Sequence, residues 1–190
     1  MTGERLKKIN AVLGLLTMIL LITHSGYMAF CYFIMTYPSL IRALSWPLAV
    51  AFCLHAMLAM SLVFMNSDGT SLALYPGYNK STVVQRISAA VLFPMLLIHL
   101  WNYQLLSMIG EAGSKAALFV FAVVEILFFG TVFTHIAVSF SRALITLGLL
   151  TSREKQRTTD KAMIIICAAL FALTAIAIVR AQVFLTMGAA

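Results

Sequence analysis

Five long apolar segments make up most of this 190-residue chain and leave little of it to fold outside a lipid bilayer. About 20 apolar residues suffice for a helix to cross the hydrocarbon core. Hydrophobic residues make up 62% of the chain and charged residues 10%, whereas soluble domains are about half apolar and a quarter charged. The sequence therefore predicts an all-α integral membrane bundle of five transmembrane helices, in a single domain covering residues 1–190. The predicted spans are Ile9–Tyr32, Ala43–Phe64, Val83–Ile109, Ala116–Ile145 and Ala162–Val183.

The distribution of Lys and Arg predicts how the bundle is oriented. With the N-terminus inside, ten basic residues fall on the inner side and three on the outer side, which follows the positive-inside rule. The N-terminus is therefore predicted to be cytoplasmic and the C-terminus to lie outside. The basic start lacks a nearby small-residue cleavage site, so we expect a retained helix rather than a signal peptide. The inner basic residues are Arg5, Lys7, Lys8, Lys80, Arg86, Arg142, Arg153, Lys155, Arg157 and Lys161, and the outer ones are Arg42, Lys115 and Arg180.

Four histidines are distributed one to each of the first four spans. At about 1.5 Å per helical residue, His24 and His99 lie roughly 20 to 24 Å from the inner basic flank. By the same estimate, His55 and His135 lie roughly 10 to 16 Å from the inner end. The histidines thus form two levels, with His24 and His99 nearer the outside.

Two histidines at one depth on different helices suit a haem iron held between two imidazoles. Two such pairs, stacked roughly 10 Å apart, would carry electrons from one membrane face toward the other. An intramembrane histidine can instead bond to a neighbouring helix or belong to a proton path. The division into two levels favours haem, and it disfavours zinc, whose ligands converge on one point.

The motifs around two of these histidines resemble those of succinate dehydrogenase and fumarate reductase cytochrome b subunits. A QR-x-S sequence precedes His99, which lies thirteen residues after Arg86. Arg142 follows His135 by seven residues, which is similar to the family's spacing between a haem ligand and an Arg near a propionate. The layout of five spans and four histidines is similar to the branch in which one polypeptide anchors the complex and binds two haems. Ala89 stands where the family usually has Gly.

The resemblance implies two haem b groups, with His24 and His99 on the distal haem and His55 and His135 on the proximal haem. It implies the membrane anchor of a succinate:quinone oxidoreductase, either succinate dehydrogenase or quinol:fumarate reductase. The chain would be the quinone-reactive subunit of that enzyme and would exchange electrons between menaquinone or ubiquinone and an iron–sulfur subunit. The dicarboxylate site is expected on a flavoprotein subunit, because this chain has no flavin fingerprint. The expected location is the inner (cytoplasmic) membrane, as a multi-pass protein in contact with lipid.

The role of Arg86 and Arg142, at the inner ends of their spans, has two interpretations. Arg86 and Arg142 would neutralise haem propionates, because a guanidinium pairs with carboxylates through two bonds. Alternatively, both residues only flank their spans. Similarly, the loop Ser67–Thr82 and the segment Arg153–Lys161 would face the iron–sulfur subunit or would be plain solvated loops.

Glu125 is the only acidic residue deep inside a span. It lies 17 residues outward of Arg142, roughly 25 Å from the inner end and level with the outer histidines. An intramembrane carboxyl group is costly and marks a functional site by default. Glu125 is therefore predicted to belong to a quinone site or proton path, and the alternative is a hydrogen bond to a neighbouring helix. Pro94, which lies before His99, predicts a kink in the third span.

Other functions stay open. One is the cytochrome b subunit of another quinone-linked oxidoreductase, such as a nitrate reductase or formate dehydrogenase anchor. Another is a haem-free proton-coupled transporter that uses the histidines and Glu125 as a relay. The net charge of +7 is explained by the basic flanks, so no nucleic acid partner is expected. Cys31, Cys53 and Cys167 fall in separate spans, which argues against a disulfide framework or an iron–sulfur site on this chain.

Overall fold

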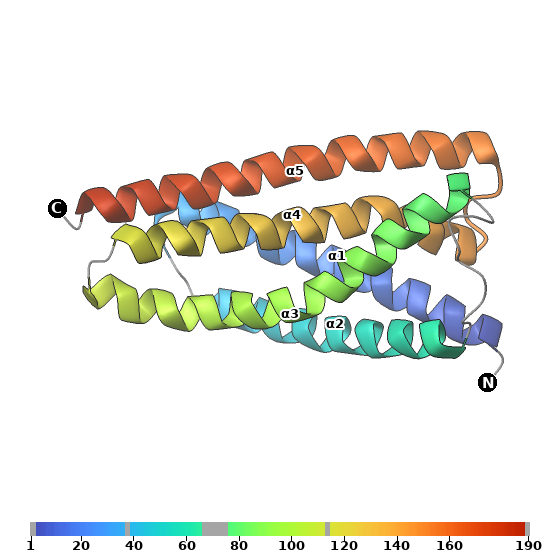
Figure 1. Ribbon diagram of the computed structural model, residues 1–190, viewed down its shortest axis with the longest axis horizontal. Coiled ribbons are helices and arrows are strands. Elements are labelled where there is room, and N and C mark those ends of the chain that lie inside the picture. The colour runs from blue at the N-terminus through green and yellow to red at the C-terminus, as the bar shows by residue number, and fades with distance from the viewer. Residues whose placement is uncertain (1–2, 37–38, 66–75, 113–114, 189–190) are drawn as a thin grey trace.

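The computed structural model is an all-helical bundle whose helices run back and forth along one long axis (Figure 1). It describes residues 3–36, 39–65, 76–112 and 115–188, and these ranges contain no strand. All five helices are long and apolar enough to cross a membrane, which confirms the predicted fold class. The helices are α1 (Gly3–Ile34), α2 (Leu40–Met65), α3 (Pro76–Ala112), α4 (Lys115–Thr146) and α5 (Arg153–Gly188).

Two helices begin well before the apolar spans predicted for them. The connecting segment expected at Arg153–Lys161 is instead the first part of α5. Ser152 caps this helix, because its Oγ accepts a hydrogen bond at 3.2 Å from the amide of Lys155. Helix α3 begins at Pro76, whose fixed φ suits a first helical position, so the loop expected at Ser67–Thr82 is helical from there on. The rest of that loop, up to residue 75, lies outside the described residues.

The bundle is built from two helix pairs, α1 with α2 and α3 with α4. Helix α4 joins them by packing against α1 as well as α3, and α5 covers α1 and α4 from one side. Within the described ranges, α2 and α3 make no close backbone approach to each other. A seam between the two pairs therefore follows α2 and α3.

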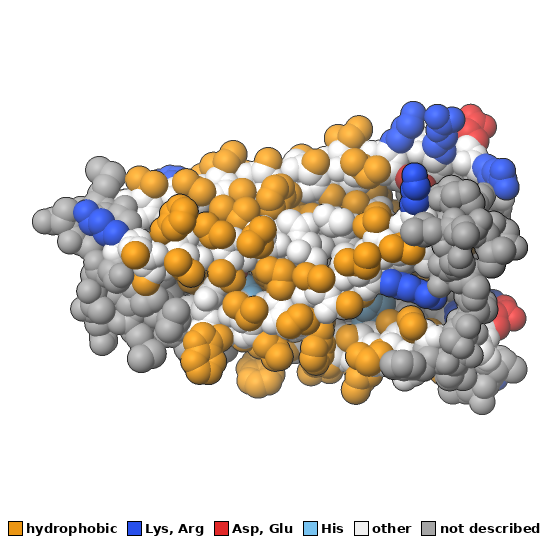
Figure 2. Space-filling model, viewed as in Figure 1, with side chains coloured by type: hydrophobic (Ala, Val, Ile, Leu, Met, Phe, Trp, Pro, Cys, Tyr) orange, Lys and Arg blue, Asp and Glu red, His pale blue; other side chains and the backbone are white. Residues whose placement is uncertain are grey.

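Helix α4 supplies six of the ten buried residues of the main core. Its aromatic residues Phe128, Phe129 and Phe133 pack with apolar side chains of α3 and α5 into the main core. Their burial follows from the position of α4, which has three neighbouring helices. Conversely, apolar side chains such as Ile165 and Phe119 point outward and are about 70% exposed. Figure 2 shows hydrophobic side chains over the middle of the bundle, where they would face lipid.

Charge is concentrated at the end of the bundle where α1 begins. Figure 2 shows most of the visible Lys and Arg side chains gathered there, and few at the opposite end. Helix α1 starts and α5 ends at opposite ends of the bundle (Figure 1), and the orientation of these ends across the membrane stays a prediction. We call the basic end the inner end and the opposite end the outer end.

Pro94 lies inside α3, as the sequence predicts. Proline lacks the amide hydrogen that would bond to the preceding turn and clashes with that turn's carbonyl group. Figure 1 shows α3 changing direction part way along its length. This bend lies between the two histidine levels described below, so α3 runs in a different direction at each level.

Candidate functional site

The four histidines of the chain form two pairs, each within electrostatic range. His24 lies on α1, His55 on α2, His99 on α3 and His135 on α4. His24 and His99 are close enough to interact electrostatically, and so are His55 and His135. These are the pairs that depth along the helices predicts. Each pair takes one histidine from α1 or α2 and the other from α3 or α4, so both pairs bridge the two halves of the bundle.

In the inner pair, both imidazole rings are held by neutral oxygen atoms. Nδ1 of His135 lies 3.0 Å from Oγ of Ser88 and 3.2 Å from the carbonyl oxygen of Gln85, both on α3. Nδ1 of His55 lies 3.3 Å from the carbonyl oxygen of Asn10 on α1. A carbonyl oxygen only accepts, so Nδ1 carries the hydrogen in both rings and Nε2 holds the lone pair.

Gly14 allows α1 to approach the ring of His55 closely. A Cβ atom at this position would lie 3.0 Å from Cε1 and 3.3 Å from Nδ1 of His55. Gly14 lies one helical turn after Asn10, so the ring rests along the Asn10–Gly14 stretch of α1. The absence of a side chain at Gly14 thus leaves room for the imidazole between α1 and α2.

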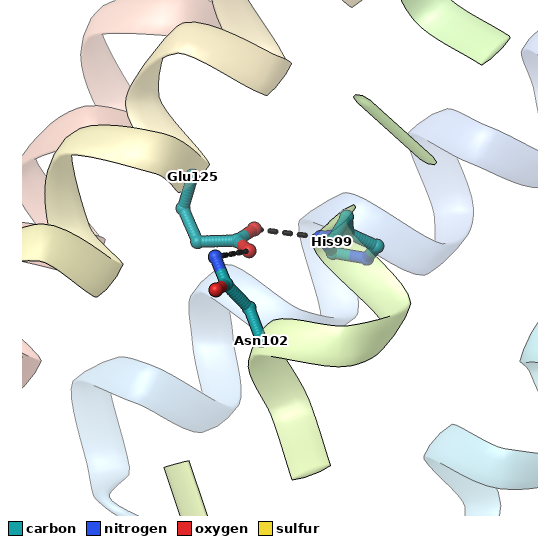
Figure 3. A network of polar contacts seen from close by, with 3 residues as sticks. All are labelled: His99, Asn102 and Glu125. Atoms are coloured by element: carbon teal, nitrogen blue, oxygen red, sulfur yellow. Dashed lines mark hydrogen bonds and ion pairs between the residues drawn. The ribbon is translucent and has the colours of Figure 1, made fainter. Parts of the chain in front are cut away.

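In the outer pair, His99 is held by a carboxylate. Nδ1 of His99 lies 2.6 Å from Oε2 of Glu125 on α4 (Figure 3). The other carboxylate oxygen, Oε1, accepts a hydrogen bond at 3.2 Å from Nδ2 of Asn102. Asn102 follows His99 by three residues on α3, so both face the same side of that helix. The three side chains form a network that joins α3 to α4.

The Glu125 network is shielded from the outside. The Glu125 side chain is only 1% exposed, and Asn102 is also buried. The ring of His99 stacks on Phe128, with ring centroids 4.5 Å apart, and meets Phe129 edge-on. Because these aromatic rings exclude water, electrostatic interactions within the network are stronger than they would be at a surface.

His24 is the histidine that the protein itself does not satisfy. Its Nδ1 is buried, and within the described part of the chain it has no hydrogen-bond partner. Burying a polar atom without a partner costs free energy, especially where no water is available. An imidazole with a buried, unsatisfied nitrogen within electrostatic range of His99 is compatible with ligand binding at this level of the bundle.

These residues fit two haem groups, each held between two imidazoles. A metal-ligating histidine commonly donates its other ring N–H to a carbonyl group or a carboxylate, which fixes its tautomer and orientation. His55, His99 and His135 all make this contact through Nδ1, so Nε2 is the nitrogen that would bind iron. Among the described residues, no three His, Cys, Asp or Glu side chains converge into a metal site, whereas axial ligation of a haem needs only two.

The two arginines predicted at the haem propionates lie near each other and near the inner pair. Arg86 on α3 and Arg142 on α4 are within electrostatic range of one another. Arg142 Nη1 donates a hydrogen bond at 2.7 Å to Oε1 of Gln85, whose carbonyl group holds His135. Asp160 on α5 is also within electrostatic range of Arg142. Two guanidinium groups within electrostatic range of each other, one of them linked to His135 through Gln85, suit carboxylate partners.

Glu125 forms hydrogen bonds to the neighbouring helix α3, which is the contact that the alternative interpretation of this residue expects. Its depth is as expected, because it contacts one of the outer histidines. Its role in quinone binding or a proton path stays a prediction.

Several residues that hold the site have no role in the sequence-based interpretation. Asn10 and Gly14 act through the backbone or close packing, which leaves no signal in residue type, whereas Gln85 belongs to the QR-x-S sequence and also accepts a hydrogen bond from Arg142 through its side chain. Ser88 and Asn102 do leave one: each lies three residues from another member of the site on α3, on the same helical face.

Comparisons with known protein families, with curated proteins and with solved structures all gave no match to this chain.

Proposed function

We propose that this chain is the dihaem cytochrome b membrane anchor of a succinate:quinone oxidoreductase, either a succinate dehydrogenase or a quinol:fumarate reductase. His24 and His99 would hold an outer haem b, and His55 and His135 an inner haem b. The proposal is supported above all by the placement of four histidines on four helices in two pairs within electrostatic range, three of them with Nδ1 directed to protein oxygen atoms.

The residues of the chain would orient and shield the haem groups. A haem iron between two imidazoles changes between ferric and ferrous states and so carries one electron. The contacts at Nδ1 fix three of the four rings, so the ligands are largely preorganised. Apolar side chains such as Phe128 and Phe129 keep water from the outer level. Arg86 and Arg142 would neutralise propionates at the inner level.

The proposed partners follow from the charge of the bundle ends. The inner end would bind the iron–sulfur subunit, which in turn contacts the flavoprotein subunit that holds the dicarboxylate site. The start of α5, with Arg153, Lys155 and Arg157, is exposed at this end and offers a positive surface to an acidic partner. Menaquinone or ubiquinone would be the electron-exchange partner within the bacterial cytoplasmic membrane.

The proposal is tested by counting haems in the purified chain, co-expressed with its neighbouring genes' products. A dithionite-reduced minus oxidised spectrum with pyridine haemochrome quantification should give two b haems per chain. His135→Ala should remove one of the two, because it takes away one axial ligand. Thr134→Ala is a matched control, since Thr134 is exposed beside His135 and its hydroxyl bonds only to the carbonyl oxygen of Gly130. Equal haem content in these two variants would contradict the ligand assignment.

The Glu125 network also favours a second candidate, a haem-free proton-coupled transporter. A buried carboxylate bonded to a histidine within a membrane is a typical element of a proton relay. A folded chain without haem, obtained in the same co-expression experiment, would favour this function over the first. Proton uptake by vesicles containing the chain would then be abolished in the Glu125→Gln variant.

A further inference from the structure

The two histidine pairs differ in the chemistry of the groups that hold them. The inner histidines donate to neutral oxygen atoms, which are two backbone carbonyl groups and a hydroxyl group. His99 of the outer pair donates to the carboxylate of Glu125, at 2.6 Å. The outer pair also includes His24, whose Nδ1 has no partner among the described residues. Only His99 contacts a carboxylate among the contacts described for the four histidines, so the effect of this charge can be measured against the inner pair in the same molecule.

We propose that Glu125, clamped by Asn102, is a positioning residue that aims His99 at the outer haem and lowers the reduction potential of that haem. The inference rests on the proposed function, because it requires a haem between His24 and His99. It assigns Glu125 a role distinct from quinone chemistry.

The direction of the effect follows from elementary electrostatics. A carboxylate that accepts the Nδ1 hydrogen draws this hydrogen toward itself and makes the imidazole a stronger electron donor to the iron. A stronger donor stabilises the ferric state, which carries one more positive charge than the ferrous state. The negative charge of the carboxylate favours the ferric state in the same way. Both effects lower the potential.

The size of the effect depends on burial. The Glu125 side chain is 1% exposed, and the His99 ring that it contacts is stacked on Phe128, so water does not screen the Glu125 charge. Asn102 donates to Oε1 and thereby restricts the carboxylate to one orientation. We expect neutralisation at Glu125 to change the ferric-to-ferrous equilibrium of the outer haem at least tenfold, which is about 59 mV for a one-electron couple.

The test is an optical redox titration of the purified haem-loaded complex, comparing wild type with Glu125→Gln. The amide keeps the size of the side chain and removes the charge. The midpoint potential of one haem should rise by about 59 mV or more, which is the tenfold change in the ferric-to-ferrous equilibrium. The midpoint potential of the other haem should stay the same within error, and both haems should be retained. The low-spin ferric g values of the affected haem should change as well, because they report the donor strength of its ligands.

Ser88→Ala is the reciprocal control. It removes a neutral contact from His135 and leaves the Gln85 carbonyl group as acceptor, so any shift belongs to the haem that Glu125→Gln does not affect. If Glu125→Gln retains two haems and neither midpoint moves, the inference is wrong although the proposed function stands. If wild type contains no haem, the proposed function itself fails.

Asn102→Leu provides a second variant if Glu125→Gln loses the outer haem. It leaves the carboxylate in place and removes the hydrogen bond that Oε1 accepts. The carboxylate is then a stronger acceptor for the Nδ1 hydrogen of His99, so the outer midpoint should fall, opposite to the change in Glu125→Gln. An unchanged midpoint in Asn102→Leu would then overturn the potential-lowering role of Glu125.

Discussion

Replacing Gly14 by alanine should weaken the inner level of the bundle, and the structure gives the size of the effect. The new Cβ atom would lie 3.0 Å from Cε1 of His55, so the ring must move by a few tenths of an ångström to reach ordinary van der Waals contact. The Nδ1 contact of His55 to the carbonyl oxygen of Asn10 is already 3.3 Å long, and such a movement breaks it. Loss of a buried hydrogen bond together with overpacking costs about 1–3 kcal/mol.

Gly26→Ala is the matched control for this substitution. Gly26 lies on the same helix, and a Cβ atom there would meet nothing within 4 Å. Both variants gain helix propensity of up to about 1 kcal/mol, so the difference between them isolates the contact with His55. We expect Gly14→Ala to bind the inner haem roughly tenfold more weakly than Gly26→Ala, since 1.4 kcal/mol corresponds to a factor of ten.

The assay is haem per chain after washing at graded detergent concentration, together with a thermal unfolding curve of each variant. Gly14→Ala should lose one haem earlier and unfold at a lower temperature than Gly26→Ala. Identical haem retention and identical unfolding temperatures would refute the argument, because they would mean that His55 relaxes away from α1 without cost.

Two further substitutions test other contacts. Arg142→Gln removes the guanidinium that bonds to Gln85 and lies near Arg86, and haem retention measured as above should fall at the inner level only. Arg180 donates to the carbonyl groups of Tyr32 and Phe33 at the end of α1, and Arg180→Ala should destabilise this end by about 1 kcal/mol because the contact is partly exposed. Faster amide hydrogen exchange in the last turn of α1, with both haems retained, is the expected result for Arg180→Ala.

Much of the fold could be predicted from apolar length alone. A bilayer admits helices as the spanning elements of such a chain, because every backbone polar group must be satisfied within its own segment. Apolar segments of sufficient length therefore set both the number of helices and their alternation. The helix ends were less predictable: α5 begins at Arg153 because Ser152 caps it, and a cap depends on local hydrogen bonding rather than on hydropathy.

The histidine levels were also predictable, because helical rise converts sequence position into depth. His24 with His99, and His55 with His135, are the pairs expected from such counting and the pairs that interact in the structure. Glu125 was expected at the outer level for the same reason, and it contacts His99 there.

The depth of a residue along its helix does not predict how that helix is rotated about its axis, and it does not predict which helices are neighbours. The direction in which a histidine points follows from packing that involves distant segments, such as the approach of α1 to His55 at Gly14. The sequence by itself thus determined the membrane-spanning helices and the two histidine levels, and the orientation by charge stays its prediction. Only the tertiary structure decided that a carboxylate holds His99 while carbonyl groups hold His55 and His135, because these contacts join residues that no local periodicity relates.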